Sequence, residues 1–171
     1  TMLTEENVIP PGGVNALTDT FGVTPLTLAE GLGRLVDSMP ERLPSEGTGS
    51  LERQRYWADI RGSRMTPDEI FELLRREFYT LPPEGLVKVG VEPGSPVVLD
   101  EGETLTLALP MRGNIQVRVE EVTERRMTFV TLAGHPLAGA IRFAVQPLEG
   151  KDAGKIRFRI DVWDRASNIV D

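Results

Sequence analysis

The feature that most constrains the fold is a two-residue alternation of apolar and polar side chains in the C-terminal half of the chain. The alternation recurs in five stretches, at 105–109, 115–120, 127–131, 141–145 and 156–162. Successive side chains of a β-strand point to opposite faces of the sheet, so this period is typical of strands with one buried face. Short turn segments separate the stretches, which predicts an antiparallel meander over residues 86–165.

The alternation also predicts which side chains form the buried face of this meander. The expected buried row is Leu105, Leu107, Val117, Val119, Phe143, Phe158 and Ile160. Trp163 directly follows Val162, so it should point away from the apolar row of its own strand. An apolar sheet face needs a cover, and the cover has to come from helices elsewhere in the chain.

Two helices are predicted upstream of the sheet. Residues 66–69, with the sequence T-P-D-E, offer an N-cap, a proline at the first helical position and two acids at the positive end of the helix dipole. A helix should therefore span about 67–79. Thr27 and Glu30 form a capping-box pair, and leucines recur behind them at helical spacing, so a second helix should span about 27–39. Together with the sheet, the helices indicate the α+β class.

The length of 171 residues is that of about one domain. Residues 1–50 are expected to form an N-terminal arm, the first helix and a linker at 40–50, because prolines and glycines interrupt this part. Residues 51–171 should form the α+β domain. The segment 51–60 is ambiguous, and a short helix is one interpretation of it.

The composition narrows the functions that the chain can have. A net charge of -7 and a pI near 4.9 oppose general nucleic-acid binding, which needs lysine and arginine to displace counterions from phosphates. No apolar run approaches the roughly 20 residues that span a bilayer, so we expect no membrane partner. The chain has one histidine and no cysteine, which disfavours a transition-metal site and fits a cytoplasmic protein. We expect no metal and no cofactor.

His135 is the sole histidine, and it lies between two predicted strands. Histidine is the side chain whose ordinary pKa lies near neutrality, so His135 is a candidate general base or ligand donor at the rim of the sheet. The alternative is a loop histidine whose ring hydrogen-bonds to the backbone and fixes the turn. A catalytic histidine would need a polar partner, which the sequence does not identify.

The most distinctive stretch of the chain is Phe129–Phe143, with the sequence F-V-T-L-A-G-H-P-L-A-G-A-I-R-F. It resembles the G-T-L-x-G-H-P-x-x-G-x-x-x-F stretch of an uncharacterised bacterial and plant family of unknown function. That family is itself similar to the helix-grip superfamily, which includes START, pollen-allergen and polyketide-cyclase-like proteins. The segment from Arg157 to Arg165 is similar to the last strand of the family, and the resemblance covers about residues 86–165.

The resemblance implies a curved antiparallel sheet wrapped around a helix, with a cavity for apolar ligands between them. Family members often carry acidic residues where this chain has Ala140 and Ile141, so an acid–base role of those acids does not transfer. Helix-grip proteins also end in a long helix, whereas only residues 165–170 follow the last strand here. The C-terminal helix is therefore expected to be missing, with truncation, an N-terminal helix or a partner as explanations.

The favoured function is the binding of a small, largely apolar molecule in a cavity between sheet and helix. The candidate ligand-binding side chains are His135, Arg142 and Trp163. One alternative is an enzyme on the same scaffold, a hydrolase or cyclase with His135 as general base. The other is a protein-interaction domain, in which the N-terminal arm or the uncapped sheet docks onto another subunit. Separately, the leucine stripe of the helix at 27–39 should be buried within the subunit or across a homodimer, with the homodimer favoured.

Overall fold

The computed structural model describes residues 16–24, 26–37, 39–81, 88–91, 98–109 and 113–168. The chain divides after Asp37 into two units, and each is described by itself. The described part of the first unit contains the helices α1 (Ala16–Asp19) and α2 (Leu28–Asp37). The helical elements described in the second unit are α3 (Pro67–Glu77) and the 3-10 turns η1 (Pro44–Glu46) and η2 (Gly150–Asp152). The strands are β1 (Glu41–Arg42), β2 (Thr48–Ile60), β3 (Lys88–Val91), β4 (Thr104–Leu109), β5 (Gly113–Thr123), β6 (Arg126–Leu132), β7 (Leu137–Pro147) and β8 (Ile156–Ala166).

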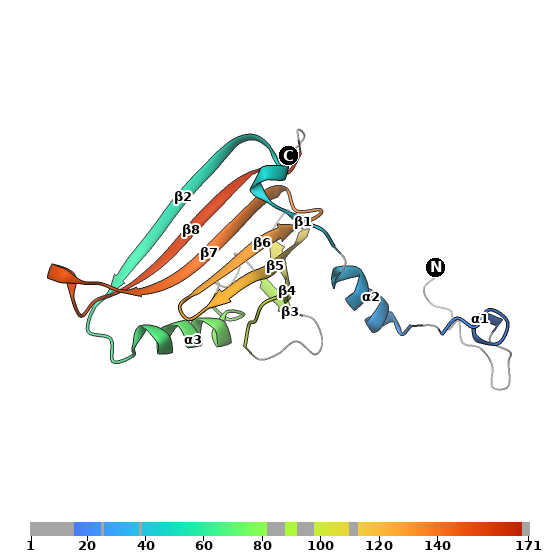
Figure 1. The fold of residues 1–171 in the computed structure, drawn as a ribbon, viewed down its shortest axis with the longest axis horizontal. Coiled ribbons are helices and arrows are strands. Elements are labelled where there is room, and N and C mark those ends of the chain that lie inside the picture. The colour runs from blue at the N-terminus through green and yellow to red at the C-terminus, as the bar shows by residue number, and fades with distance from the viewer. Residues whose placement is uncertain are drawn as a thin grey trace. The chain divides into compact units, whose positions relative to one another are not determined.

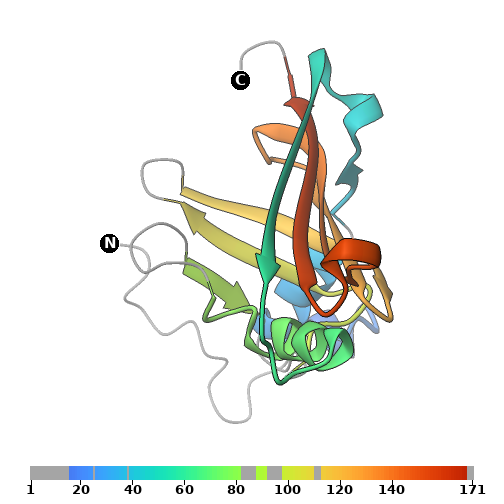
Figure 2. The ribbon, with the colours of Figure 1, turned by 90° about the vertical axis from the view of Figure 1, so that its left-hand side faces the viewer.

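The strands of the described residues join in one antiparallel sheet, in the order β2-β8-β7-β6-β5-β4-β3, and β1 pairs with β6. From β3 to β8, strands that follow one another in the sequence are neighbours in the sheet, which confirms the predicted meander. Figure 2 shows how strongly the sheet curves, since β4 and β5 cross the direction of β2 and β8. The predicted α+β class with a curved antiparallel sheet is therefore correct.

The predicted register is also correct. Phe143 pairs with Ile160 and therefore shares a sheet face with it, and we call this the inner face. Leu105, Val117 and Val119 are fully or almost fully buried, and the other side chains of the predicted row are partly buried. Trp163 pairs with Ala140 on the opposite face, called the outer face, as the alternation predicts.

Helix α3 begins where the sequence indicates. The backbone N–H of Glu69 donates to Oγ1 of Thr66 at 3.2 Å, and the N–H of Thr66 donates to the Glu69 carboxylate at 2.7 Å. This reciprocal pair is a capping box. Phe71 and Leu74 are buried in the core, so α3 lies against the inner face (Figure 1). β8 is the last regular element of the described residues, so α3 provides the helical cover of the inner face in the second unit.

The segment 51–60, for which a short helix was one interpretation, is a strand. β2 pairs with β8 from Glu52 opposite Asp164 to Ile60 opposite Ile156. Within the expected linker at 40–50, β1 and the first residues of β2 belong to the sheet, so the linker prediction is wrong there. The physical reason is that nearly every side chain of β2 is exposed, so no apolar alternation marks the strand.

Helix α2 also has the predicted capping box, in which the N–H of Thr27 donates to the Glu30 carboxylate at 2.8 Å. The leucines of its apolar stripe are exposed, with 79% for Leu28, 52% for Leu32 and 61% for Leu35. Their burial within the subunit or across a homodimer stays a prediction, and most of the expected N-terminal arm lies outside the described residues. In the described part of the chain, no helix has the length and apolarity needed to cross a membrane.

Candidate functional site

A hollow of about 490 Å³ lies between α3 and the inner face of β7 and β8, and we call it the inner hollow. The helix and the residues after it contribute Ile70, Leu73, Leu74, Phe78 and Leu81. The sheet contributes Phe143, Phe158 and Ile160. Every one of these side chains is apolar, and the volume is within the range of small-molecule sites.

Both walls of the inner hollow follow from sequence periods. Ile70 and Leu74 of α3 and its C-cap residue Phe78 follow one another at intervals of four residues, so they lie on one side of the helix. Phe158 and Ile160 are two residues apart on β8, so they share the inner face. The structure brings together two rows that the sequence marks separately.

Phenylalanine rings link the helix wall to the sheet wall. The Phe78 ring stacks on Phe129 with the centroids 5.0 Å apart, and it meets Phe143 edge-on at 5.4 Å. The ring centroid of Phe143 in turn lies 6.3 Å from that of Phe158. Phe129 is 1% exposed and belongs to the core cluster, so the rings that line the hollow rest on a fully packed neighbour.

Two polar groups near the end of α3 were missed by the sequence analysis. Oη of Tyr79 and Oε2 of Glu103 are buried and lack a hydrogen-bond partner. Burial raises the pKa of the Tyr79 phenol and the pKa of the Glu103 carboxyl, and repulsion from Glu103 raises that of Tyr79 further. No motif marks these residues, because their burial depends on how α3 and the turn before β4 pack.

His135 lies in the turn between β6 and β7 and is 8% exposed. The backbone N–H of Leu137 donates to its Nδ1 at 2.9 Å. Burial lowers the pKa of His135, while the Leu137 backbone and the Asp164 carboxylate partly oppose this. The neutral ring is therefore favoured. The hydrogen bonds seen for the ring go to the backbone of Leu137, as expected for a histidine that fixes its turn.

Other residues of the stretch Phe129–Phe143 also stabilise contacts between strands. A Cβ on Gly139 would lie 2.7 Å from the carbonyl oxygen of Trp163, so β7 and β8 approach too closely there for any larger residue. The N–H of Gly139 donates to Oγ1 of Thr131 at 3.0 Å, and that hydroxyl donates to the carbonyl of Arg42 at 2.8 Å. The most distinctive motif of the sequence is therefore explained by strand packing.

The structure brings together two of the three predicted ligand-binding residues, but away from the inner hollow. Arg142 places its guanidinium carbon 5.4 Å from the centroid of the Trp163 ring, on the outer face. His135 lies apart from them at the rim. The expectation that these side chains line the sheet–helix cavity is wrong, because Arg142 stands between the inward-facing Ile141 and Phe143 and must point outward. A ligand-binding role for them elsewhere stays a prediction.

No family model matches the chain, and no curated protein matches it by sequence. Solved structures do match it. A point mutant of norcoclaurine synthase from Thalictrum flavum, in complex with a transition-state analogue, is similar over 70% of this chain and 78% of its own, with 9% identity and a TM-score of 0.50. Ara h 8.0201 is similar over 68% and 80%, with 10% identity and a TM-score of 0.47. An uncharacterised Bacillus thuringiensis protein is similar over 67% and 79%, with 20% identity and a TM-score of 0.44.

At such low identities, the likeness to the synthase concerns the fold alone. It agrees with the architecture described above, in which one curved antiparallel sheet packs around a helix. The chain therefore has the helix-grip-like fold that its family-like stretch implies.

Proposed function

We propose that the protein binds a small, largely apolar molecule in the inner hollow. The observation that carries the proposal is the lining, which is apolar on both walls and is partly open to water. Exposing apolar surface costs roughly 25 cal/mol per Å², so a ligand that covers the lining recovers that free energy.

The lining also defines the ligand chemically. Among the described residues, no charged side chain lines the inner hollow, so the part of the ligand inside it should be uncharged and apolar. Leu73 and Leu81, which are 42% and 54% exposed, mark where the hollow opens. A polar end of the ligand would stay hydrated at this opening.

The fold supports the proposal. The norcoclaurine synthase mutant with a similar fold was solved in complex with a transition-state analogue. The geometry around His135 does not favour the enzyme alternative, because the ring is held by the backbone of Leu137 and does not line the inner hollow.

The first experiment is a titration with N-phenyl-1-naphthylamine, an uncharged fluorescent probe that the arginines of the outer face will not attract. We expect saturable binding that Leu73→Trp weakens about tenfold or more, because the larger ring fills the opening. Leu51→Trp is the matched control, since Leu51 is a similarly exposed leucine that does not line the hollow. Equal affinity of both variants and the unaltered protein would contradict the proposal.

The second experiment identifies the natural ligand. Native mass spectrometry of the protein purified from its own host should show a retained adduct of small-molecule mass. Leu73→Trp, purified in the same way, should carry less of this adduct than Leu51→Trp. If neither an adduct nor probe binding is found, the proposed function is wrong.

A further inference from the structure

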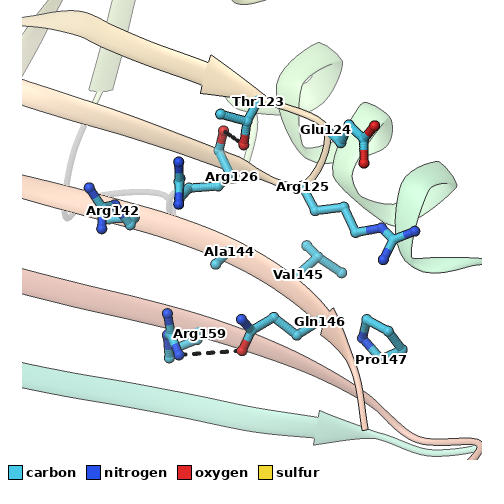
Figure 3. A pocket seen from close by; sticks show the side chains of 10 residues that line it. All are labelled: Thr123, Glu124, Arg125, Arg126, Arg142, Ala144, Val145, Gln146, Pro147 and Arg159. Atoms are coloured by element: carbon cyan, nitrogen blue, oxygen red, sulfur yellow. Dashed lines mark hydrogen bonds between the residues drawn. The ribbon is translucent and has the colours of Figure 1, made fainter.

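The outer face carries a second hollow, of about 610 Å³, which we call the outer hollow. Its lining comes from the end of β5, the turn after it, and the strands β6, β7 and β8, as Figure 3 shows. Ala144 lies in the middle of this group, paired with Arg126 on one side and Arg159 on the other. Paired residues point to the same face, so two arginines flank a methyl group.

The sheet geometry explains why a hollow forms at this place. Neighbouring strands lie about 4.8 Å apart, so the backbones that carry Arg126 and Arg159 are roughly 10 Å apart. Only the methyl group of Ala144 stands between them. Arg142 and Gln146 lie two residues to either side of Ala144 on β7 and therefore share its face. Three guanidinium groups thus surround a floor that is one alanine wide.

On one side of the outer hollow, two of these arginines share a single carboxylate. Nη2 of Arg126 lies 2.6 Å from Oε1 of Glu121, and Nη2 of Arg142 lies 3.7 Å from Oε2 of the same side chain. Nε of Arg126 is buried without a hydrogen-bond partner. The cluster of Arg126, Arg142 and Glu121 therefore has an excess positive charge and an unused hydrogen-bond donor.

On the other side of the outer hollow, two arginines again share one carboxylate. Asp161, whose side chain is 2% exposed, lies 2.5 Å from Nε of Arg55 and 2.8 Å from Nε of Arg159. The contact with Arg159 lacks hydrogen-bond geometry, whereas Nη1 of Arg159 donates to Oε1 of Gln146 at 3.3 Å. Across the two groups, four guanidiniums share two carboxylates.

The residues at the edge of the outer hollow change its net charge little. Arg125 is neutralised by Asp68 of α3 through two hydrogen bonds of 2.6 and 3.1 Å. Of the lining side chains in the described part of the chain, Glu124 carries the one carboxylate, and it lies on the turn between β5 and β6. Positive charge therefore predominates at the floor, in a chain whose net charge is -7.

We propose that the outer hollow binds a small molecule that carries a phosphate group, held by Arg126, Arg142 and Arg159. The planar guanidinium fork matches the oxygens of a phosphate and forms short, charge-assisted hydrogen bonds with them. A phosphate dianion would offset the excess charge of the two arginine groups. The volume of the hollow leaves room beside the phosphate for an organic part. This site is separate from the inner hollow and does not depend on the function proposed there.

Trp163 provides a direct reporter of this binding. The chain has two tryptophans, and Trp57→Phe leaves Trp163 as the single emitter. Arg142 lies over the Trp163 ring, so an anion that recruits its guanidinium should change the emission of Trp163. Arg53 lies over the same ring at 5.5 Å but does not line the outer hollow, which makes it the matched control.

The experiment titrates the Trp57→Phe protein with inorganic pyrophosphate and inorganic phosphate, while sodium chloride keeps the ionic strength constant. We expect a saturable change in emission, confirmed by calorimetry. Arg126→Gln and Arg142→Gln should each weaken pyrophosphate about tenfold or more, the usual scale for a hydrogen bond to a charged group. Arg53→Gln should leave the affinity within about twofold. Equal losses in Arg53→Gln and Arg142→Gln, or the same emission change with chloride alone, would overturn the proposal.

A charge-neutral variant keeps the test independent of any effect of arginine loss on folding. Ala144→Leu fills the floor of the outer hollow and should abolish pyrophosphate binding without changing the net charge, while circular dichroism checks that the sheet is intact. A folded Ala144→Leu protein with unchanged affinity would contradict the proposal. So would a single-stranded oligonucleotide that binds more tightly than pyrophosphate and depends equally on Arg53 and Arg142. The uncharged naphthylamine probe should bind all these variants equally.

Discussion

The two faces of β7 and β8 differ sharply in the chemistry of their side chains. The inner face presents Phe143, Phe158 and Ile160 to the inner hollow, whereas the outer face presents Arg142 and Arg159 to the outer hollow. Both sets come from the same two strands because side chains alternate across a sheet. The two proposals therefore assign a different chemical class of molecule to each face, and substitutions on one face should leave the other unaffected.

The largest expected effect separates the packed core from the inner hollow. Phe129→Ala should lower the free energy of unfolding by about 3–5 kcal/mol, because Phe129 is fully packed. Phe143→Ala should cost clearly less, because one side of Phe143 already borders the hollow and has less packing to lose. Urea denaturation of the two variants measures both values. Equal losses would indicate that the inner hollow is filled by packing.

The next effect tests whether the outer face is held together by ion pairs. Asp161→Asn should cost about 1–3 kcal/mol, because Arg55 and Arg159 lose the carboxylate that they share. Asp59→Asn is the control, since Asp59 pairs with Arg157 at a more exposed position and its loss should be smaller. Comparing the free energies of unfolding of the two variants tests whether the buried ion pairs of Asp161 stabilise the outer face. A larger loss for Asp59→Asn than for Asp161→Asn would refute this role.

The smallest effect concerns the rim, where His135 belongs to neither face. Burial lowers the pKa of folded His135 below the value of about 6.5 that it has when unfolded. The unfolded chain therefore takes up the proton first as the pH falls, so the contribution of His135 to stability is complete above about pH 6.5 and is lost below it.

His135→Gln isolates this contribution, because its amide oxygen can still accept from the N–H of Leu137. Between pH 7.5 and pH 5, the melting temperature of the unaltered protein should fall more than that of His135→Gln. Probe binding in the inner hollow should be the same in both proteins. If His135→Gln abolished it instead, the histidine would have to be assigned to the binding site.

Much of the fold could be predicted because its signals are local. The capping boxes at Thr27 and Thr66 lie within three residues of their partners, and the strands from β4 to β8 each carry their own alternation. β2 could not be found in this way. Its side chains are exposed on both faces, so what makes it a strand is its pairing with β8, far away in the sequence.

The inner hollow was easier to predict than the outer hollow, because its signals are local in the sequence. The apolar rows that line the inner hollow follow from helix and strand periods, so a sheet–helix cavity could be expected. The outer hollow depends on Ala144 standing opposite both Arg126 and Arg159, which is a matter of register across three strands. The sequence singled out Arg142 and Trp163, but only the structure shows that they face away from the inner hollow.

The pairing of β2 with β8 also bears on how the chain is made. Asp59 and Arg157, which hold the two strands together by two hydrogen bonds, lie 98 residues apart in the sequence. During synthesis, β2 therefore emerges long before the strand that it pairs with, and contacts between such distant segments form slowly. An unpaired strand invites aggregation, and charged side chains discourage it. The charged side chains of β2, which are Glu52, Arg53, Arg55 and Asp59, interrupt any apolar alternation and so hid the strand from sequence analysis. The same charges would discourage aggregation of β2 until β8 has been synthesised.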